Sequence, residues 1–239
     1  MSGLNRAYKR RPSMVSMNGG PVLCLDAGSK LSYPGTGTTW TDLSGNGNNG
    51  TLTNGPTFDS ANGGSLVFNG TNQYGVCSAL ANYNFGSALT VEFVHKNVSS
   101  ATYRGVVSNV YITGTGFDFR YGRENYFGGT NNGTRLGCSI TTSVTSYSVN
   151  INAEVDLWGH YCFTYNGSLL QSYKNGQAFT SIAASGSLGS NTNPVTIARN
   201  SNNGEYLLGP LPVVKLYTRA LSATEIATNF ELLRGRYGI

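Results

Sequence analysis

The feature that most restricts how this chain can fold is the dipeptide Asn-Gly, which occurs ten times in 239 residues. Asn and Gly both tolerate positive φ, which the tight turns of β-hairpins require. Between these dipeptides lie short runs of alternating or β-branched residues. Many short strands at this spacing are typical of an antiparallel sandwich or barrel. We expect strands at residues 64–68, 89–95, 103–110, 116–121, 145–151, 159–165, 169–174, 195–198 and 212–217.

One helix is expected near the C-terminal end, in residues 221–235. Ser222 and Glu225 have the spacing of a capping box, in which each side chain accepts a backbone N–H from the other residue. Apolar residues then recur at helical spacing, and Gly235 is expected to end the helix. No linker is apparent within residues 21–239, so we expect them to form one domain.

Positive charge is concentrated in residues 1–20, which hold four basic residues and no acidic one, whereas the rest of the chain has 12 basic and 11 acidic residues. This segment is interpreted as a basic N-terminal arm, either a solvated tail or a segment that docks on a larger assembly. The arm residues that would make such contacts are Arg6, Tyr8, Lys9, Arg10 and Arg11. Four basic groups are a modest signal for phosphate binding, so nucleic acid is not expected as a partner.

Membrane spans and zinc sites are not indicated by the sequence. No apolar run approaches the roughly 20 residues that a membrane-spanning helix needs, and no secretory signal is visible. The four cysteines, Cys24, Cys77, Cys138 and Cys162, form no Cys-x-x-Cys pair. We expect them to be small core residues.

Five segments carry a family resemblance through their order and spacing. They are residues 23–60, with WTDLSGNGNNGTL; 64–74, GSLVFNGTNQY; 89–93, LTVEF; 158–176, beginning WGHYCFTYNG; and 216–239, ending RGRYGI. Together they resemble the laminin G-like family of concanavalin A-like sandwiches, especially versions found in bacteriophage structural proteins. The resemblance implies an all-β fold, a two-sheet antiparallel jelly-roll sandwich with one short C-terminal helix. It also implies that Trp40 and Trp158 lie in or near the core.

Calcium is the first ligand that the resemblance suggests, since many laminin G-like domains bind it at a loop rim. The family often has Phe-Asp-Gly-x-x-Asp-Tyr, but Asn69 and Gln73 stand here in place of the two acids. Asp26 and Asp42 remain as further candidates, although Asp42 also fits the cap of the turn that follows it. Because calcium favours several carboxylate oxygens, we expect no cofactor and little contribution from calcium.

Catalysis is not expected. Some relatives in the superfamily are glucanases with Glu-x-Asp-x-x-Glu, whereas the nearest stretch, from Glu154 to Asp156, lacks the third acid. It also aligns with the loop before the Trp-x-His strand. His160 and Cys162 share one face of a predicted strand, where a packed pair is favoured over a reactive dyad.

Residues 117–133, FDFRYGRENYFGGTNNG, are rich in the aromatic, amide and charged groups that lectins use. The candidates are Tyr121, Arg123, Glu124, Asn125, Tyr126 and Asn131. The same residue types are enriched at protein–protein interfaces, so both interpretations stay open.

Two functions follow from the resemblance. The first is a non-enzymatic bacteriophage virion protein, either a capsid-decorating (cement) or a tail-associated subunit, which the arm anchors to major capsid or tail subunits. Such a protein would form a homo-oligomer in the assembly and would locate to the virion after assembly in the host cytoplasm, without contact to a membrane. The alternative is a carbohydrate-binding adhesin module that recognises a host surface glycan.

Overall fold

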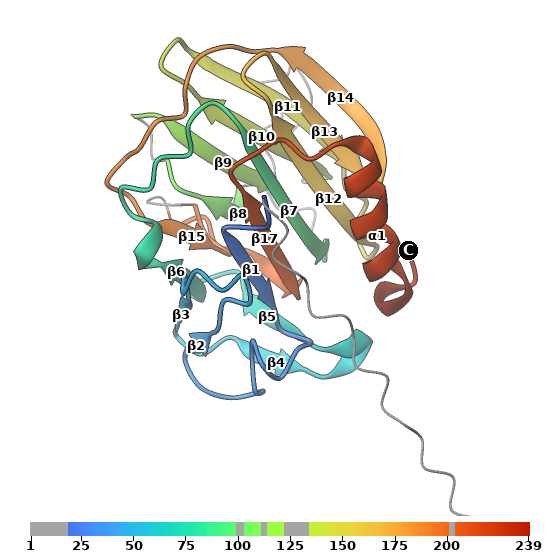
Figure 1. Ribbon diagram of the computed structural model, residues 1–239. Helices are drawn as coiled ribbons and strands as arrows, with labels where there is room; N and C mark the ends of the chain where they lie inside the picture. The colour runs from blue at the N-terminus through green and yellow to red at the C-terminus, as the bar shows by residue number, and fades with distance from the viewer. Residues whose placement is uncertain (1–18, 99–102, 111–113, 122–133, 201–203) are drawn as a thin grey trace, which may run out of the picture.

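The computed structural model describes residues 19–98, 103–110, 114–121, 134–200 and 204–239, which form stacked antiparallel sheets (Figure 1). One sheet has the strand order β11 (Ser146–Asn152), β10 (Arg135–Thr141), β9 (Gly116–Tyr121), β8 (Arg104–Ser108), β15 (Val195–Ile197), β6 (Tyr74–Cys77), β3 (Gly50–Thr53) and β2 (Thr39–Trp40). A second has the order β1 (Leu23–Asp26), β17 (Val213–Tyr217), β7 (Leu89–Lys96), β12 (Trp158–Tyr165), β13 (Leu169–Lys174) and β14 (Gln177–Ala183). A small sheet holds β16 (Leu208–Leu211), β5 (Ser65–Asn69) and β4 (Thr57–Asp59).

The helical elements are one α-helix, α1 (Ala223–Tyr237), and two short 3-10 turns, η1 (Ala61–Gly63) and η2 (Ser78–Leu80), among the described residues. All nine strands predicted from the sequence are present, most of them within one residue of the expected bounds. These elements confirm the prediction of an all-β antiparallel sandwich with one C-terminal helix. No helix in the described part of the chain is long and apolar enough to cross a membrane.

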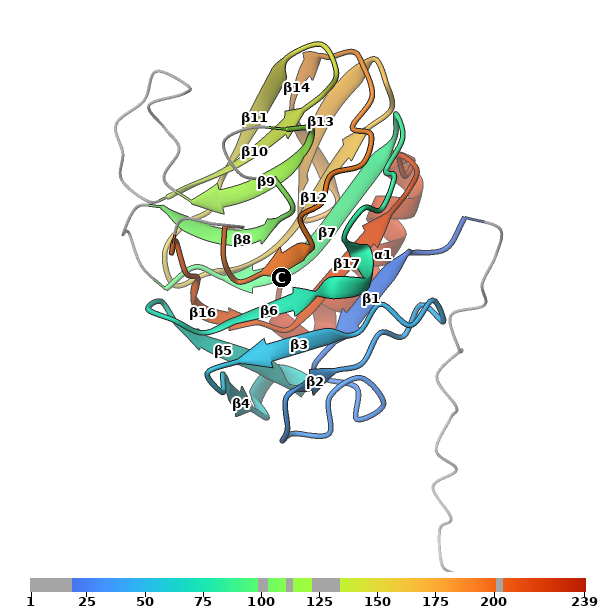
Figure 2. The ribbon, with the colours of Figure 1, turned by 90° about the vertical axis from the view of Figure 1, so that its left-hand side faces the viewer.

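The eight-stranded and six-stranded sheets face each other (Figure 2). Aromatic side chains lie in the core between them. Phe119 of β9 lies 4.9 Å, between ring centroids, from Phe163 of β12, and Phe163 lies 6.3 Å from Phe93 of β7. Such ring pairs add about 0.5–1.5 kcal/mol each beyond the area that they bury. Trp40 is fully buried in the same cluster, as predicted.

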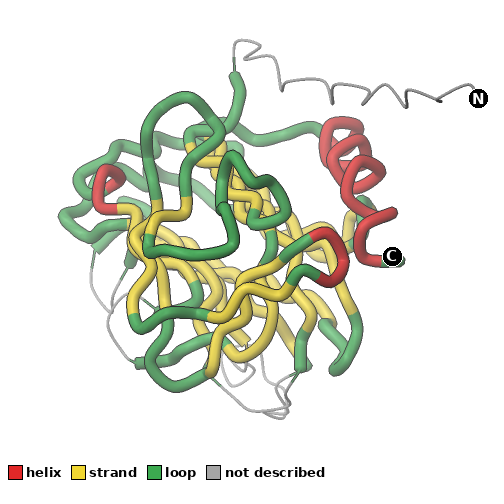
Figure 3. Tube along the Cα trace, turned by 90° about the horizontal axis from the view of Figure 1, so that it is seen from below, coloured by secondary structure: helices red, strands yellow, loops and turns green. Residues whose placement is uncertain are grey.

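Helix α1 packs on the outer side of the six-stranded sheet (Figures 2 and 3). The predicted capping box is present, since Ser222 accepts the backbone N–H of Glu225 and the Glu225 carboxylate accepts the N–H of Ser222. The prediction that Gly235 ends the helix is wrong. The last turn continues because Tyr237 packs against Trp158, with 4.9 Å between ring centroids. Gly238 ends the helix instead, with the left-handed backbone (φ 67°) that such an end requires.

A buried charge pair lies beneath the helix, in the middle of the six-stranded sheet. The strand register sets Glu92 of β7 opposite Lys215 of β17. Lys215 Nζ lies 2.8 Å from Glu92 Oε1, and Asn229 of α1 donates to Glu92 Oε2 at 2.7 Å. Burial opposes ionisation of Glu92, but Lys215 and a hydrogen bond to His160 outweigh it and lower the Glu92 pKa to about 2. The pair therefore stays ionised and ties the helix to the sheet.

The four cysteines are buried, as expected of core residues, and in the structure they are unpaired. Burial raises the pKa of Cys24 and Cys77 to about 12, and it raises that of Cys138 and Cys162 well above the ordinary value. His160 Nε2 lies 3.3 Å from Glu92 Oε1. His160 is thus directed to Glu92, and the raised pKa keeps the Cys162 thiol protonated. Both observations favour a packed His160–Cys162 pair over a reactive dyad.

Replacing Glu92 with Gln should lower the free energy of unfolding by about 3–5 kcal/mol, because Lys215 is then buried without a counter-charge. The double variant Glu92→Leu with Lys215→Met removes both charges and should recover part of this loss. Equilibrium urea unfolding measures both. Equal losses in the single and double variants would show that packing, rather than the unpaired charge, causes the destabilisation.

Candidate functional site

Most of the site residues predicted from the sequence lie outside the described residues. These are the arm residues Arg6, Tyr8, Lys9, Arg10 and Arg11, and Arg123, Glu124, Asn125, Tyr126 and Asn131 of the segment between β9 and β10. Their proposed contacts stay predictions.

Tyr121 is described, and its prediction as a ligand contact is wrong. Only 1% of Tyr121 is exposed, and its hydroxyl lies 2.8 Å from His95 Nδ1. His95 Nε2 lies 3.3 Å from the Leu208 carbonyl oxygen. Because a carbonyl oxygen can only accept a hydrogen bond, Nε2 carries the proton, and Nδ1 accepts the hydrogen bond from the tyrosine hydroxyl. Burial lowers the His95 pKa to about 3, which keeps the ring neutral. The reason is strand alternation, since Phe117, Phe119 and Tyr121 all face the core.

The two candidate calcium carboxylates have internal partners. Arg236 donates to both oxygens of Asp26, at 2.8 and 3.0 Å. Asp42 accepts the backbone N–H groups of Cys24 at 2.8 Å and Ser44 at 2.9 Å, so it does cap the turn that follows it. No group of three or more His, Cys, Asp or Glu that could hold a metal occurs among the described residues. The small contribution expected of calcium stays a prediction.

Asn69 and Gln73 form a closed turn by themselves. The Asn69 side-chain oxygen accepts the N–H of Thr71 at 2.9 Å, and the Gln73 oxygen accepts the N–H of Asn69 at 2.9 Å. Gln73 Nε2 donates to the carbonyls of Asn54 at 3.1 Å and Gly55 at 2.9 Å. These bonds fix the loop from which β6 begins, and its first residue is Tyr74.

Tyr74, Arg199 and Tyr206 gather at this end of the eight-stranded sheet, and we call them the tyrosine–arginine cluster. The Arg199 guanidinium carbon lies 3.8 Å above the centre of the Tyr74 ring. The Tyr74 and Tyr206 rings are 6.0 Å apart between centroids and tilted by 40°. All three side chains are half-buried, so they combine a fixed arrangement with access to solvent.

Backbone geometry explains why Arg199 stands beside Tyr74. Strand β15 ends at Ile197, and Ala198 takes a left-handed conformation (φ 60°), which is strained for a residue other than glycine. Arg199 then pairs with Tyr206 in an isolated antiparallel bridge. The Thr196 hydroxyl donates to the Arg199 carbonyl at 3.0 Å. The described segments on either side of this bridge, Ala198–Asn200 and Glu205–Leu207, form a narrow ribbon.

Asn200 and Glu205 adjoin the bridged pair, and they contact the charged residues of β9 on the outer face of the sheet. Arg120 contacts Asp118 at 2.6 Å and Glu205 at 2.7 Å. Asn200 Nδ2 lies 3.4 Å from both carboxylates. These four residues form an arginine latch, in which Asp118 is 2% and Arg120 8% exposed. The latch fastens the ribbon, and with it the cluster, to the sheet.

Gly105 of β8 allows the ribbon to pack directly on the eight-stranded sheet. A Cβ at this position would lie 2.0 Å from the backbone nitrogen of Asn200 and 2.4 Å from the carbonyl carbon of Arg199. Backbone atoms cannot move aside as flexible side chains do. The glycine is therefore required because the ribbon passes directly over it.

Some arginines of the described chain contact a carboxylate and others do not. Outside the latch, Arg219, Arg234 and Arg236 each contact a carboxylate. Arg199 has no such partner among the described residues, and its Nε is shielded from solvent without an acceptor.

A second arginine beside the cluster also lacks a carboxylate in the part of the chain that the structure describes. Arg104 donates to the Gly70 and Tyr206 carbonyls, both at 3.1 Å. Burial lowers the pKa of Arg104, as expected for a cation without a counter-charge.

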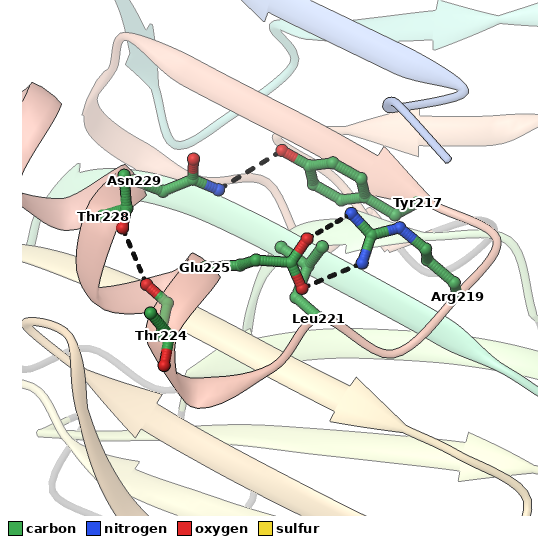
Figure 4. A pocket seen from close by; sticks show the side chains of 7 residues that line it. All are labelled: Tyr217, Arg219, Leu221, Thr224, Glu225, Thr228 and Asn229. Atoms are coloured by element: carbon green, nitrogen blue, oxygen red, sulfur yellow. Dashed lines mark hydrogen bonds and ion pairs between the residues drawn. The ribbon is translucent and has the colours of Figure 1, made fainter. Parts of the chain in front are cut away.

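A shallow hollow beside α1 offers less for recognition (Figure 4). Its principal charged groups, Arg219 and Glu225, form a two-pronged pair at 2.6 and 3.0 Å. Arg219 lowers the Glu225 pKa to about 2, and the same carboxylate caps the helix. The charges of this hollow thus stabilise the start of α1.

The Glu154–Asp156 stretch lies between β11 and β12, in the loop where the sequence predicted it. Glu154 pairs with Lys174 of β13, which lowers the Glu154 pKa. Asp156 has a left-handed backbone (φ 64°) at the turn into β12. These contacts support the loop, and no second carboxylate is seen paired with Glu154 for acid–base chemistry among the described residues.

Replacing Gly105 with Ala should detach the ribbon and lower the free energy of unfolding by about 1–3 kcal/mol, because the methyl group overlaps the Asn200 backbone. Gly235→Ala is the matched control, since that position is helical and open. The control should stabilise the protein by up to about 1 kcal/mol. Thermal unfolding of both variants measures the difference, and a neutral Gly105→Ala would contradict the close approach.

Solved structures with the same fold include one arabinanase domain and two binding domains. Domain 4 of AbnA, a GH43 extracellular arabinanase from Geobacillus stearothermophilus solved with arabinotriose, aligns with a TM-score of 0.67 at 15% identity, over 88% of this chain and 98% of that one. The binding domain of Paraclostridial Mosquitocidal Protein 1 gives 0.66 at 16% identity, over 88% and 52%. The binding domain of botulinum neurotoxin DC, in complex with rat synaptotagmin II, gives 0.68 at 12% identity, over 90% and 52%.

The chain therefore spans about half the length of the toxin domains that it matches. No curated protein matches the sequence significantly. A family model does match residues 69–227, well over half of the chain, and it describes the concanavalin A-like lectin/glucanases superfamily. This match confirms the resemblance that the sequence motifs suggested, and the chain belongs to the concanavalin A-like lectin/glucanases superfamily, in its laminin G-like branch.

Proposed function

We propose that this protein is a non-catalytic module that binds glycans through the tyrosine–arginine cluster. The observation that carries the proposal is the pair of half-buried tyrosine rings beside an arginine that has no carboxylate partner in the described part of the chain. Sugar rings present C–H groups that pack on the negative face of an aromatic ring, and their hydroxyls take hydrogen bonds from the surrounding polar groups. Aromatic rings with a few fixed polar groups are the usual composition of a small-molecule site.

The fold relatives support recognition rather than catalysis. The matching arabinanase domain was solved with arabinotriose, and the toxin neighbours are binding domains. In the protein itself, Asp118 and Glu205 both contact Arg120 and are held by the latch. Glycoside hydrolysis needs one carboxyl group as an acid and a second one at a set distance, each free to meet the substrate. A pair bound to one guanidinium does not meet that requirement.

Tyr74→Ala and Tyr206→Ala should each weaken glycan binding about 3–10-fold, because each removes a stacking surface. Phe179→Ala is the matched control, since Phe179 is 45% exposed on β14 of the other sheet. A glycan array identifies the ligand, and isothermal titration calorimetry measures the affinities. An equal loss in the Phe179 variant, or an array on which the protein binds nothing, would contradict the proposal.

Attachment to a larger assembly is a second proposal and rests on a separate observation. Residues 1–20 hold four basic groups and no acid, and Arg219 Nε donates to the carbonyl of Gly19 at 2.7 Å. The described chain thus begins at a fixed point beside α1. We propose that the preceding segment docks the protein onto acidic partner subunits, for which a bacteriophage capsid or tail in the virion is the expected setting.

Deleting residues 1–18 should abolish incorporation into particles while leaving glycan binding unchanged. The basis for this expectation is that the tyrosine–arginine cluster is built entirely from strands and loops after residue 50. Co-sedimentation with assembled particles measures incorporation, and calorimetry measures glycan binding. Undiminished incorporation of the truncated protein would refute the anchoring role.

A further inference from the structure

The partners of Arg199 indicate which class of glycan the cluster takes. Its guanidinium stacks on Tyr74 at 3.8 Å and makes no ion pair within the described residues. An arginine whose guanidinium carbon lies over a ring can still direct N–H groups outward in the plane of the guanidinium. That edge matches a carboxylate, which accepts two parallel hydrogen bonds.

The charges around the cluster favour an anion. Among the described residues, Arg104, Arg120 and Arg199 at this end of the sheet have two carboxylates near them, Asp118 and Glu205. Both carboxylates are engaged by Arg120 in the latch. Within the described residues the excess positive charge therefore resides on Arg104, which donates to the Tyr206 carbonyl, and on Arg199, which pairs with Tyr206 in the bridge.

The arrangement is also fixed before any ligand arrives. The latch, the Arg199–Tyr206 bridge and the Ala198 turn hold the ribbon in place, so little freedom is lost when a ligand binds. A neutral sugar would cover the Arg199 guanidinium without supplying a charged acceptor, and burying an unpaired charged donor is unfavourable. A carboxylate supplies that acceptor.

We propose that the tyrosine–arginine cluster selects acidic glycans, in which a sugar carboxylate, as in a uronic or sialic acid, is bound by Arg199 while the sugar ring packs against Tyr206. This proposal rests on the proposed glycan-binding function and adds the ligand class to it. Arg199 is the specificity-determining residue, and the tyrosines supply the surface that any sugar can use.

The test uses the full chain on an array that pairs sialylated and uronate-containing glycans with their desialylated or carboxyl-reduced counterparts. We expect binding to acidic members and at least a tenfold loss on each neutral counterpart. Arg199→Gln should reduce binding to the acidic members at least tenfold, and Arg199→Lys should restore it only in part, because a lysine lacks the planar fork. Inorganic phosphate is the competing probe, and it should displace acidic glycans only weakly.

Arg234→Gln is the matched control, since it removes a surface charge from α1 on the other sheet. It should leave binding unchanged, and thermal unfolding checks that all variants fold. Binding to neutral glycans with no preference for the acidic partners would overturn this inference while sustaining the proposed function. An array without any bound glycan would overturn both, and strong displacement by phosphate would assign the site to phosphate instead of carboxylate.

Discussion

The contact of Arg120 with two carboxylates is the interaction on which the outer face of the eight-stranded sheet depends. Asp118 comes from the same strand, whereas Glu205 comes from a ribbon more than 80 residues later in the chain. Taking three charges out of water costs several kcal/mol per ion, and their mutual attraction repays this only when the geometry is good. The latch therefore adds little net stability to the fold. Its effect is to fix the position at which the ribbon docks on the sheet.

The six-stranded sheet uses the same device for a different element. There Glu92 and Lys215 form the buried pair, and Asn229 brings α1 to it. In both sheets a charge pair on the face away from the core selects where a covering segment docks. Apolar contacts hold the two sheets together without fixing such positions, because the hydrophobic effect has no direction.

Sequence patterns predicted the architecture well, since strand alternation and Asn-Gly turns are local signals. The same alternation, applied to Phe-Asp-Phe-Arg-Tyr at residues 117–121, would have separated the core side from the latch side and excluded Tyr121 as a ligand contact. The seven-residue strand β10 was missed, and so was β16, because its partner β5 is distant in the chain. For the same reason the cluster was not predicted, because Tyr74, Arg199 and Tyr206 meet only through tertiary structure. Only Gly105, the isolated glycine in a strand pattern, offered a sequence signal of close backbone approach.

Three unfavourable features coincide at the cluster: a strained Ala198, a buried ionic latch and an arginine that has no counter-charge among the residues that the structure describes. Each costs free energy in the isolated protein, and none is needed to close the sandwich. Strain of this kind persists where the surrounding structure enforces it, and it is concentrated at functional sites. A ligand carboxylate would relieve the last of the three, so binding free energy at this site would come partly from a charge that folding leaves unpaired. If the proposed function holds, ligand preference is set by side chains on the ribbon rather than by the fold, which many unrelated binding functions share.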